Sequence, residues 1–61
     1  MYSKYANLRD KKGVNDLTVS KETGILPSTL SDWKAGRYTP KVDKLKKLAD
    51  YFGVKIEDLL S

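Results

Sequence analysis

Apolar residues recur along this chain at spacings of three and four, which is the period of an amphipathic α-helix. The clearest example is the segment 42–52, VDKLKKLADYF. Its apolar residues form one stripe, with lysines and aspartates on the other faces; the stripe consists of Val42, Leu45, Leu48, Ala49 and Phe52. No alternating run of β-branched residues is long enough to form a β-strand. The pattern therefore predicts an all-α protein.

The same spacing predicts four further helices. We expect one at about residues 2–12, a second from near Asp16 to Thr23, a third from about Pro27 to Ala35, and a short last one. Their inner faces are expected to carry Tyr5 and Leu8, then Val19 and Thr23, then Leu30 and Trp33, and finally Ile56, Leu59 and Leu60. At 61 residues the chain is expected to be one domain, 1–61, folded as a compact five-helix bundle.

All four glycines fall where these helices should end: Gly13, Gly24, Gly36 and Gly53. Glycine adopts the left-handed backbone conformation that closes a helix without a steric penalty. After Gly24 a brief turn leads to Pro27, which suits the first turn of a helix because its missing N–H is not needed there. The second and third helices therefore form a helix-turn-helix arrangement.

The third helix presents most of its surface outward, because only Leu30 and Trp33 are expected to face the core. A tryptophan among basic residues could instead be a stacking platform for single-stranded nucleic acid. Its spacing of three from Leu30 favours the core. No stacking groove is expected from four further aromatic residues, which are assigned to three different faces: Tyr2, Tyr5, Tyr51 and Phe52.

Composition narrows the possible functions. The chain has no cysteine and no histidine, which are common metal ligands and general bases, and it has no glycine-rich phosphate loop. We therefore expect neither an enzyme nor a metal or cofactor site, and no small-molecule substrate. No apolar run approaches the ~20 residues that cross a bilayer. The N-terminus, MYSKYANLRD, is too polar for a signal peptide. We expect a cytoplasmic protein without a membrane partner.

The formal net charge of +4 is unevenly distributed along the chain. Residues 34–47 contain one acidic residue, Asp43, and six basic ones: Lys34, Arg37, Lys41, Lys44, Lys46 and Lys47. Residues 15–33 contain Lys21 against three acidic residues. The basic stretch could contact phosphate, or it could be a solvated face that keeps a small domain soluble. Charge alone leaves both interpretations open.

Three stretches of the chain resemble the Cro/CI-type helix-turn-helix repressor family: VSKETGI, STLSDWKAGRYTPK and LKKLADYFGVKIEDLL. The resemblance runs from about Tyr5 to Leu60. It implies a lambda-repressor-like five-helix domain that binds double-stranded operator DNA, commonly as a two-fold homodimer, in phage and prophage switches and bacterial regulators. We therefore expect a transcriptional regulator, acting as a repressor, of which this chain can be the N-terminal part.

The resemblance also assigns DNA contacts. The family's base-contacting positions fall on Pro27, Ser28 and Asp32. Its phosphate-contacting positions fall on Arg9, Asn15, Asp16, Thr29, Ala35 and Arg37, with Lys34, Tyr38 and Lys41 in or next to the loop that holds Arg37. The family's subunit contact falls on the last helix, at Ile56, Leu59 and Leu60.

The chemistry of these residues suits DNA only in part. Asp32 could accept a hydrogen bond from a cytosine amine, or be a solubilising acid that never meets DNA. Ser28 suits any base edge, and Pro27 could contact only a thymine methyl group. Arg37 is well placed to hold a phosphate, or it could be a plain solvent-exposed arginine. Asp16 favours folding at a helix N-terminus but would repel phosphate there.

Two residues of the helix-turn-helix unit depart from the family's pattern. Ser20 stands where alanine is usual, so its hydroxyl needs a partner, which we expect to be a carbonyl one turn back. Leu26 stands where serine, threonine or proline is frequent, so the third helix is expected to lack a side-chain N-cap that contributes about 1 kcal/mol.

A protein-interaction module with the same fold, such as an antitoxin-like or antirepressor-like partner, is the alternative function. The acidic balance of residues 15–33 and the missing donor at Pro27 favour it. A complete lack of binding to random duplex DNA at low salt would select this alternative.

Overall fold

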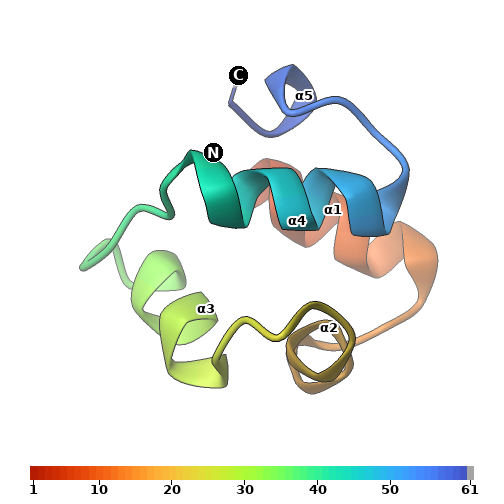
Figure 1. The fold of residues 1–61 in the computed structure, drawn as a ribbon. Coiled ribbons are helices and arrows are strands. Elements are labelled where there is room, and N and C mark those ends of the chain that lie inside the picture. The colour runs from red at the N-terminus through yellow and green to blue at the C-terminus, as the bar shows by residue number, and fades with distance from the viewer. Residues whose placement is uncertain (61) are drawn as a thin grey trace.

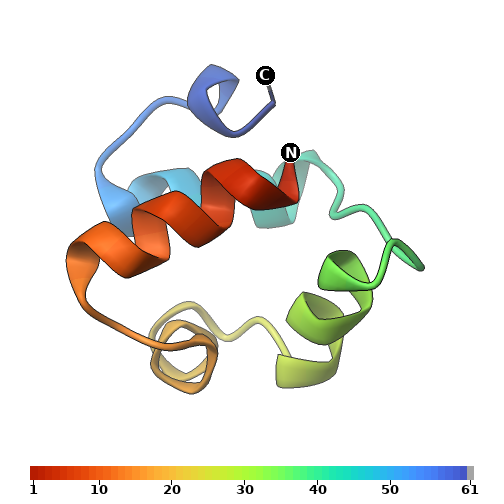
Figure 2. The ribbon, with the colours of Figure 1, turned by 180° about the vertical axis from the view of Figure 1, so that it is seen from behind.

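A computed structural model describes residues 1–60, and Ser61 lies outside the described residues. Its helices are α1 (Tyr2–Lys12), α2 (Asp16–Thr23), α3 (Pro27–Lys34), α4 (Val42–Phe52) and α5 (Glu57–Leu60). α1 and α4 lie side by side through the middle of the molecule, with α2 and α3 below them and α5 above (Figures 1 and 2). The predicted all-α fold is confirmed, with α3 ending one residue earlier than expected, at Lys34.

The core takes buried apolar residues from every helix and from the turn between α2 and α3. They are Tyr5, Val19, Ile25, Leu30, Trp33, Leu45, Leu48, Ala49 and Leu59. Val42 was expected on the inner stripe, but it is 69% exposed. The reason is that Val42 is the first residue of α4, and the core begins one turn later, at Leu45.

Aromatic rings join α1, α3 and α4 at one point in this core. The Tyr5 ring lies 5.4 Å from Trp33, 5.6 Å from Tyr2 and 6.0 Å from Phe52, measured between ring centroids, and Tyr51 packs on Phe52 at 5.0 Å. The expectation of aromatic residues on three separate faces is therefore wrong, because the crossing of the helices brings these rings together. Trp33 is 4% exposed, which confirms that it belongs to the core. Such ring pairs stabilise α3 against α1.

Hydrogen bonds from two hydroxyl groups fix the turn between α2 and α3. The Ser20 hydroxyl is buried and donates to the backbone carbonyl of Ile25, five residues further on. The expected partner one turn back is therefore wrong. Gly24 has a left-handed conformation (φ 80°), and the chain then turns back so that the Ile25 carbonyl faces α2. The Thr23 hydroxyl donates to the Val19 carbonyl within α2 at 2.7 Å and accepts from the Ile25 N–H in the turn at 3.3 Å. The start of α3 is thereby held against α2.

Candidate nucleic-acid interface

The exposed side of α3 forms one face of the molecule together with the loop that follows it. Pro27 and Ser28 are exposed at the start of α3. The neighbouring Leu26 is 65% exposed, and it makes no side-chain cap, as expected. Thr29 is half-buried on the same helix. The first turn of α3 thus exposes apolar side chains and hydroxyl groups. The sequence analysis considered Leu26 only as a missing N-cap and did not predict that it belongs to this surface.

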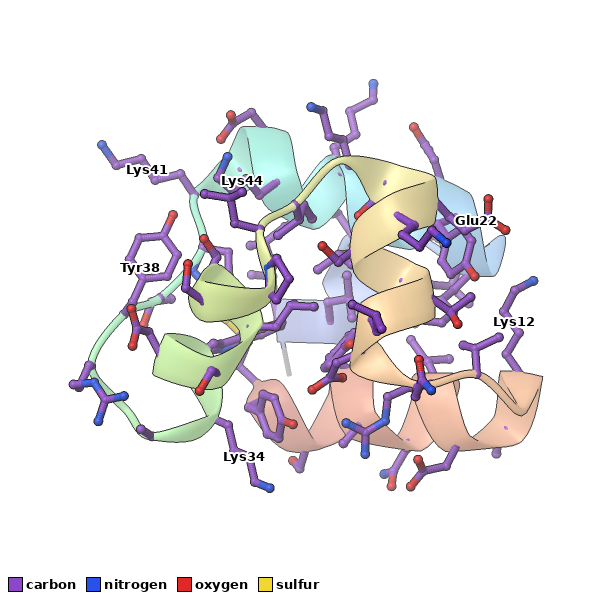
Figure 3. The ribbon with its side chains drawn as sticks, turned by 90° about the horizontal axis from the view of Figure 1, so that it is seen from below. Lys12, Glu22, Lys34, Tyr38, Lys41 and Lys44 are labelled. Atoms are coloured by element: carbon purple, nitrogen blue, oxygen red, sulfur yellow. The ribbon has the colours of Figure 1, made fainter. Side chains whose placement is uncertain are left out.

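Basic and phenolic side chains surround this surface of α3. Figure 3 shows Lys34, Tyr38, Lys41 and Lys44 around the helix, whereas Glu22 and Lys12 lie on the side away from α3. Lys44, which was not assigned to the site, is half-buried beside this loop, and its place in the run of basic residues was the signal for it.

Two lysines of the same basic run lie elsewhere. Lys47 lines a hollow between α2 and α4 with Glu22 and Asp50, and Lys46 lines another hollow between α4 and α5. The positive charge of residues 34–47 is therefore divided between α3's face and other surfaces, which the linear run could not show.

A Schellman motif closes α3 and connects the helix to its loop. Gly36 has φ 78°, and its N–H donates to the Trp33 carbonyl at 3.1 Å, while the Arg37 N–H donates to the Asp32 carbonyl at 2.9 Å. Ala35 uses its own N–H for the Ser31 carbonyl at 3.0 Å. Since the alanine side chain has no donor, the phosphate contact assigned to Ala35 has no group left to make it.

The side chains of Asp32 and Arg37 form an ion pair. Arg37 donates from Nη2 at 3.0 Å and from Nε at 3.2 Å, and both bonds reach the same oxygen, Oδ1 of Asp32. The two side chains remain 44% and 67% exposed. Sequence reasoning treated these residues separately, as a base contact and a phosphate contact. The signal that could have joined them is Gly36, whose left-handed conformation turns the chain so that Arg37 returns to Asp32.

A second network lies where α1 meets the start of α2. Asp16 Oδ1 accepts hydrogen bonds from the Tyr5 hydroxyl at 2.6 Å and from Arg9 Nη1 at 2.9 Å. Arg9 also bonds Asp10 through Nε at 3.1 Å and the Tyr2 hydroxyl through Nη1 at 3.3 Å. The positions assigned to phosphate at Arg9 and Asp16 are thus engaged with each other, and their charges cancel locally.

The protonation states in this network follow from its geometry. Burial by itself raises the pKa of Asp16, but hydrogen bonds from Tyr5 and Arg9 outweigh it, and the net pKa is lowered. Burial and then the bond to Asp16 raise the pKa of the Tyr5 phenol above its usual range. The bond to Asp16 is the largest cause of a raised pKa at Arg9. Asp16 stays ionised, Tyr5 stays protonated, and the network holds α2 against α1.

The front of α2 has one further polar group. Asn15 is exposed and caps the helix, with its Oδ1 accepting from the Thr18 N–H at 2.9 Å. Its amide nitrogen remains a donor on the same edge as the start of α2, as a phosphate contact requires.

The residues expected to join two subunits are split between core and surface. Leu59 is fully buried in the protein's own core, Ile56 is half-buried, and Leu60 is 49% exposed. The assignment of Leu59 to a subunit surface is therefore wrong for this conformation, because α5 uses it to pack on the bundle.

Two kinds of feature are absent from residues 1–60. None of the helices there combines the length and apolarity needed to cross a membrane. That part of the chain also holds no group of three or more acidic side chains that could bind a metal ion.

Comparisons with known proteins agree with this geometry. The family model described as helix-turn-helix matches residues 6–59. The chain is also similar to the cryptic phage CTXphi transcriptional repressor RstR of Vibrio cholerae, with 32% identity over 59 residues, which cover 97% of this chain and 53% of that protein. The chain therefore spans about half the length of this curated relative. No solved structure matches.

Proposed function

The chain belongs to the helix-turn-helix family of the Cro/CI repressor type, and from this premise we propose that it binds double-stranded operator DNA and represses transcription. One observation carries the proposal. α3 is anchored by Leu30 and Trp33, while its opposite side is exposed and surrounded by the cationic and phenolic groups shown in Figure 3. A short rigid helix in this setting fits the major groove, whose phosphate walls would meet the surrounding basic groups.

In this proposal the opening turn of α3 contacts the bases. Pro27 and Leu26 offer apolar surface to thymine methyl groups, and Ser28 can donate to or accept from a base edge. These groups discriminate weakly among base pairs. Part of the selectivity is therefore expected to come from the shape and stiffness of the duplex.

The phosphate contacts are proposed to lie on both sides of α3. Asn15 and Thr29 supply polar groups at the fronts of the two helices, and Arg37 supplies the nearest guanidinium. Four further groups continue the line around the loop: Lys34, Tyr38, Lys41 and Lys44. Arg9 and Asp16 act in this proposal by holding α2 in place, because they are paired with each other.

We propose further that the chain binds DNA as a homodimer, and the dimensions of the molecule are compatible with this. The described residues extend 25 Å along their longest axis, whereas one turn of DNA is about 34 Å long. A second copy on the next half-site would allow a palindromic operator to be read. We propose that Leu60 and the exposed part of Ile56 supply the apolar contact between copies.

Selection of bound sequences from a random duplex pool tests the proposed function. We expect enrichment of a short motif repeated with two-fold symmetry, and binding that weakens steeply with salt. If no duplex were retained even at low salt, the DNA-binding proposal would be wrong. The chain would then be assigned to the alternative class, a module that binds protein through the same fold.

A further inference from the structure

We infer that Asp32 is a positioning residue for Arg37, which it aims at a DNA phosphate, and is not itself a reader of bases. The inference rests on the proposed function, because it requires this face to meet DNA. It assigns Asp32 a role different from that of the matching position in the family.

The backbone brings the two residues together before the side chains contribute. Gly36 has the left-handed conformation, and the Arg37 N–H is bonded to the Asp32 carbonyl at 2.9 Å. This bond is the six-to-one closure of the Schellman motif, so the Cα of Arg37 is fixed relative to the last turn of α3. A loop residue thereby acquires the rigidity of a helix end.

The carboxylate of Asp32 then fixes one edge of the guanidinium. Nε and Nη2 both donate to Oδ1, which occupies the edge that these two nitrogens share. Arginine has five N–H donors, and the end formed by Nη1 and the second N–H of Nη2 makes no hydrogen bond within residues 1–60. That free end is a fork of the kind that binds two oxygens of one phosphate.

The exposure of both side chains indicates that the pair contributes to ligand binding and not to the stability of the fold. With 67% of the Arg37 side chain and 44% of the Asp32 side chain exposed, the pair adds little to stability. The pair instead orders the Arg37 side chain in advance. Without the pair, this side chain would lose rotamer freedom when it bound a phosphate. The arginine also neutralises the carboxylate, which alone would repel the DNA backbone.

A double-mutant cycle on DNA affinity tests the inference. The variants are Arg37→Ala, Asp32→Asn and the double variant, each measured against a fluorescently labelled random-sequence duplex of about two helical turns over a series of salt concentrations. Removing the Asp32 carboxylate also raises the net charge, which strengthens binding to any polyanion. Glu22→Gln is the matched control, because Glu22 is exposed, lies away from α3 and adds the same charge when neutralised.

We expect Arg37→Ala to weaken binding about tenfold in the parent and in the Glu22→Gln background. It should also reduce the slope of log affinity against log salt by about 0.9, the value for one phosphate contact. In the Asp32→Asn background the same change should cost only about threefold. Asp32→Glu keeps a carboxylate within reach of Arg37. In that background the loss of DNA affinity caused by Arg37→Ala should be close to the loss in the parent.

If Arg37→Ala weakened DNA binding by the same factor in the parent and in the Asp32→Asn background, the inference would be wrong. The proposed function would still stand. The same would follow from a loss of preference for one base pair in Asp32→Asn, measured on the selected duplex, with the cost of Arg37→Ala unchanged. If instead the parent bound none of the duplexes at low salt, the proposed function itself would fail. A thermal melt of each variant, expected to match the parent, shows that the fold is retained.

Discussion

Two arginine–aspartate pairs of nearly equal length have opposite surroundings in this molecule. Arg9 Nη1 lies 2.9 Å from Asp16 Oδ1, and Arg37 Nη2 lies 3.0 Å from Asp32 Oδ1. The first pair joins α1 to α2, with the Arg9 side chain 21% exposed, whereas the Arg37 side chain is 67% exposed. The same contact therefore holds two helices together in one place and leaves a guanidinium open to a ligand in the other.

The neighbours of each pair account for this difference. Arg9 is shared with Asp10 and the Tyr2 hydroxyl, and its guanidinium carbon lies 5.7 Å from the centroid of the Tyr5 ring. For Arg37, the side-chain bonds within residues 1–60 all reach one oxygen of Asp32. A distance between charges does not distinguish a structural pair from the pair proposed to bind DNA. The number of neighbours and the exposure of the guanidinium do.

The largest expected effect on stability comes from removing the Tyr5 side chain, which lies in the core and bonds Asp16 of the Arg9–Asp16 pair. Tyr5→Ala removes a fully buried ring that packs on Trp33 and Phe52, and it should lower the free energy of unfolding by about 3–5 kcal/mol. That is comparable with the whole stability of a domain this small. Denaturant unfolding followed by circular dichroism measures it. Tyr5→Phe is the control, which removes only the hydroxyl bonded to Asp16 and should cost about 1 kcal/mol.

A smaller effect is expected from Asp16, and it should depend on pH. Asp16→Asn removes the negative charge from the group that accepts from Arg9 and Tyr5, which should cost about 1 kcal/mol at neutral pH because the carboxylate is partly exposed. The folded-state pKa of Asp16 is lowered, so its contribution is present above the unfolded pKa of about 3.9 and is lost as pH falls through the folded value. Unfolding curves measured from pH 7 downward should therefore converge for parent and variant in acid. A constant difference at every pH would contradict this account.

A backbone substitution beside the exposed Asp32–Arg37 pair should cause a loss of stability similar to that of Asp16→Asn, or a smaller one. Gly36→Ala places a side chain at φ 78° in open space, so its cost is the left-handed strain alone, about 1 kcal/mol. Because this strain favours other conformations of the turn that brings Arg37 to Asp32, the affinity for random duplex DNA should fall as well, by less than with Arg37→Ala. Stability loss with unchanged DNA affinity would separate the turn from the binding surface.

The helices were predictable because their signals are local. The apolar spacing in 42–52 and the left-handed glycines gave the bounds of the helices almost to the residue. Contacts between elements were not predictable in the same way. Ser20 bonds the Ile25 carbonyl because of the path of the turn, and Val42 is exposed because it is the first residue of α4, ahead of the buried Leu45. Hydrogen-bond partners and exposure of this kind depend on where the other elements lie in the folded structure.

The candidate site shows the same division. The exposure of Pro27 and Ser28 followed from the inward spacing of Leu30 and Trp33. The pairing of charged residues did not follow from their positions in the chain, since Arg9 and Asp16 are seven residues apart on different helices. Which arginine is exposed enough for the proposed DNA contact is therefore a property of the folded structure.

Replacing each arginine in turn tests most directly whether the two pairs have different roles. Both Arg9→Ala and Arg37→Ala remove one positive charge, and each is measured for denaturant stability and for salt-dependent binding to random duplex DNA. We predict that Arg9→Ala costs about 1–2 kcal/mol of stability and leaves the salt slope close to the parent's. Arg37→Ala should change stability by less than about 0.5 kcal/mol and reduce the slope by about 0.9. Equal reductions of the slope in both variants, or the larger stability loss in Arg37→Ala, would contradict the account.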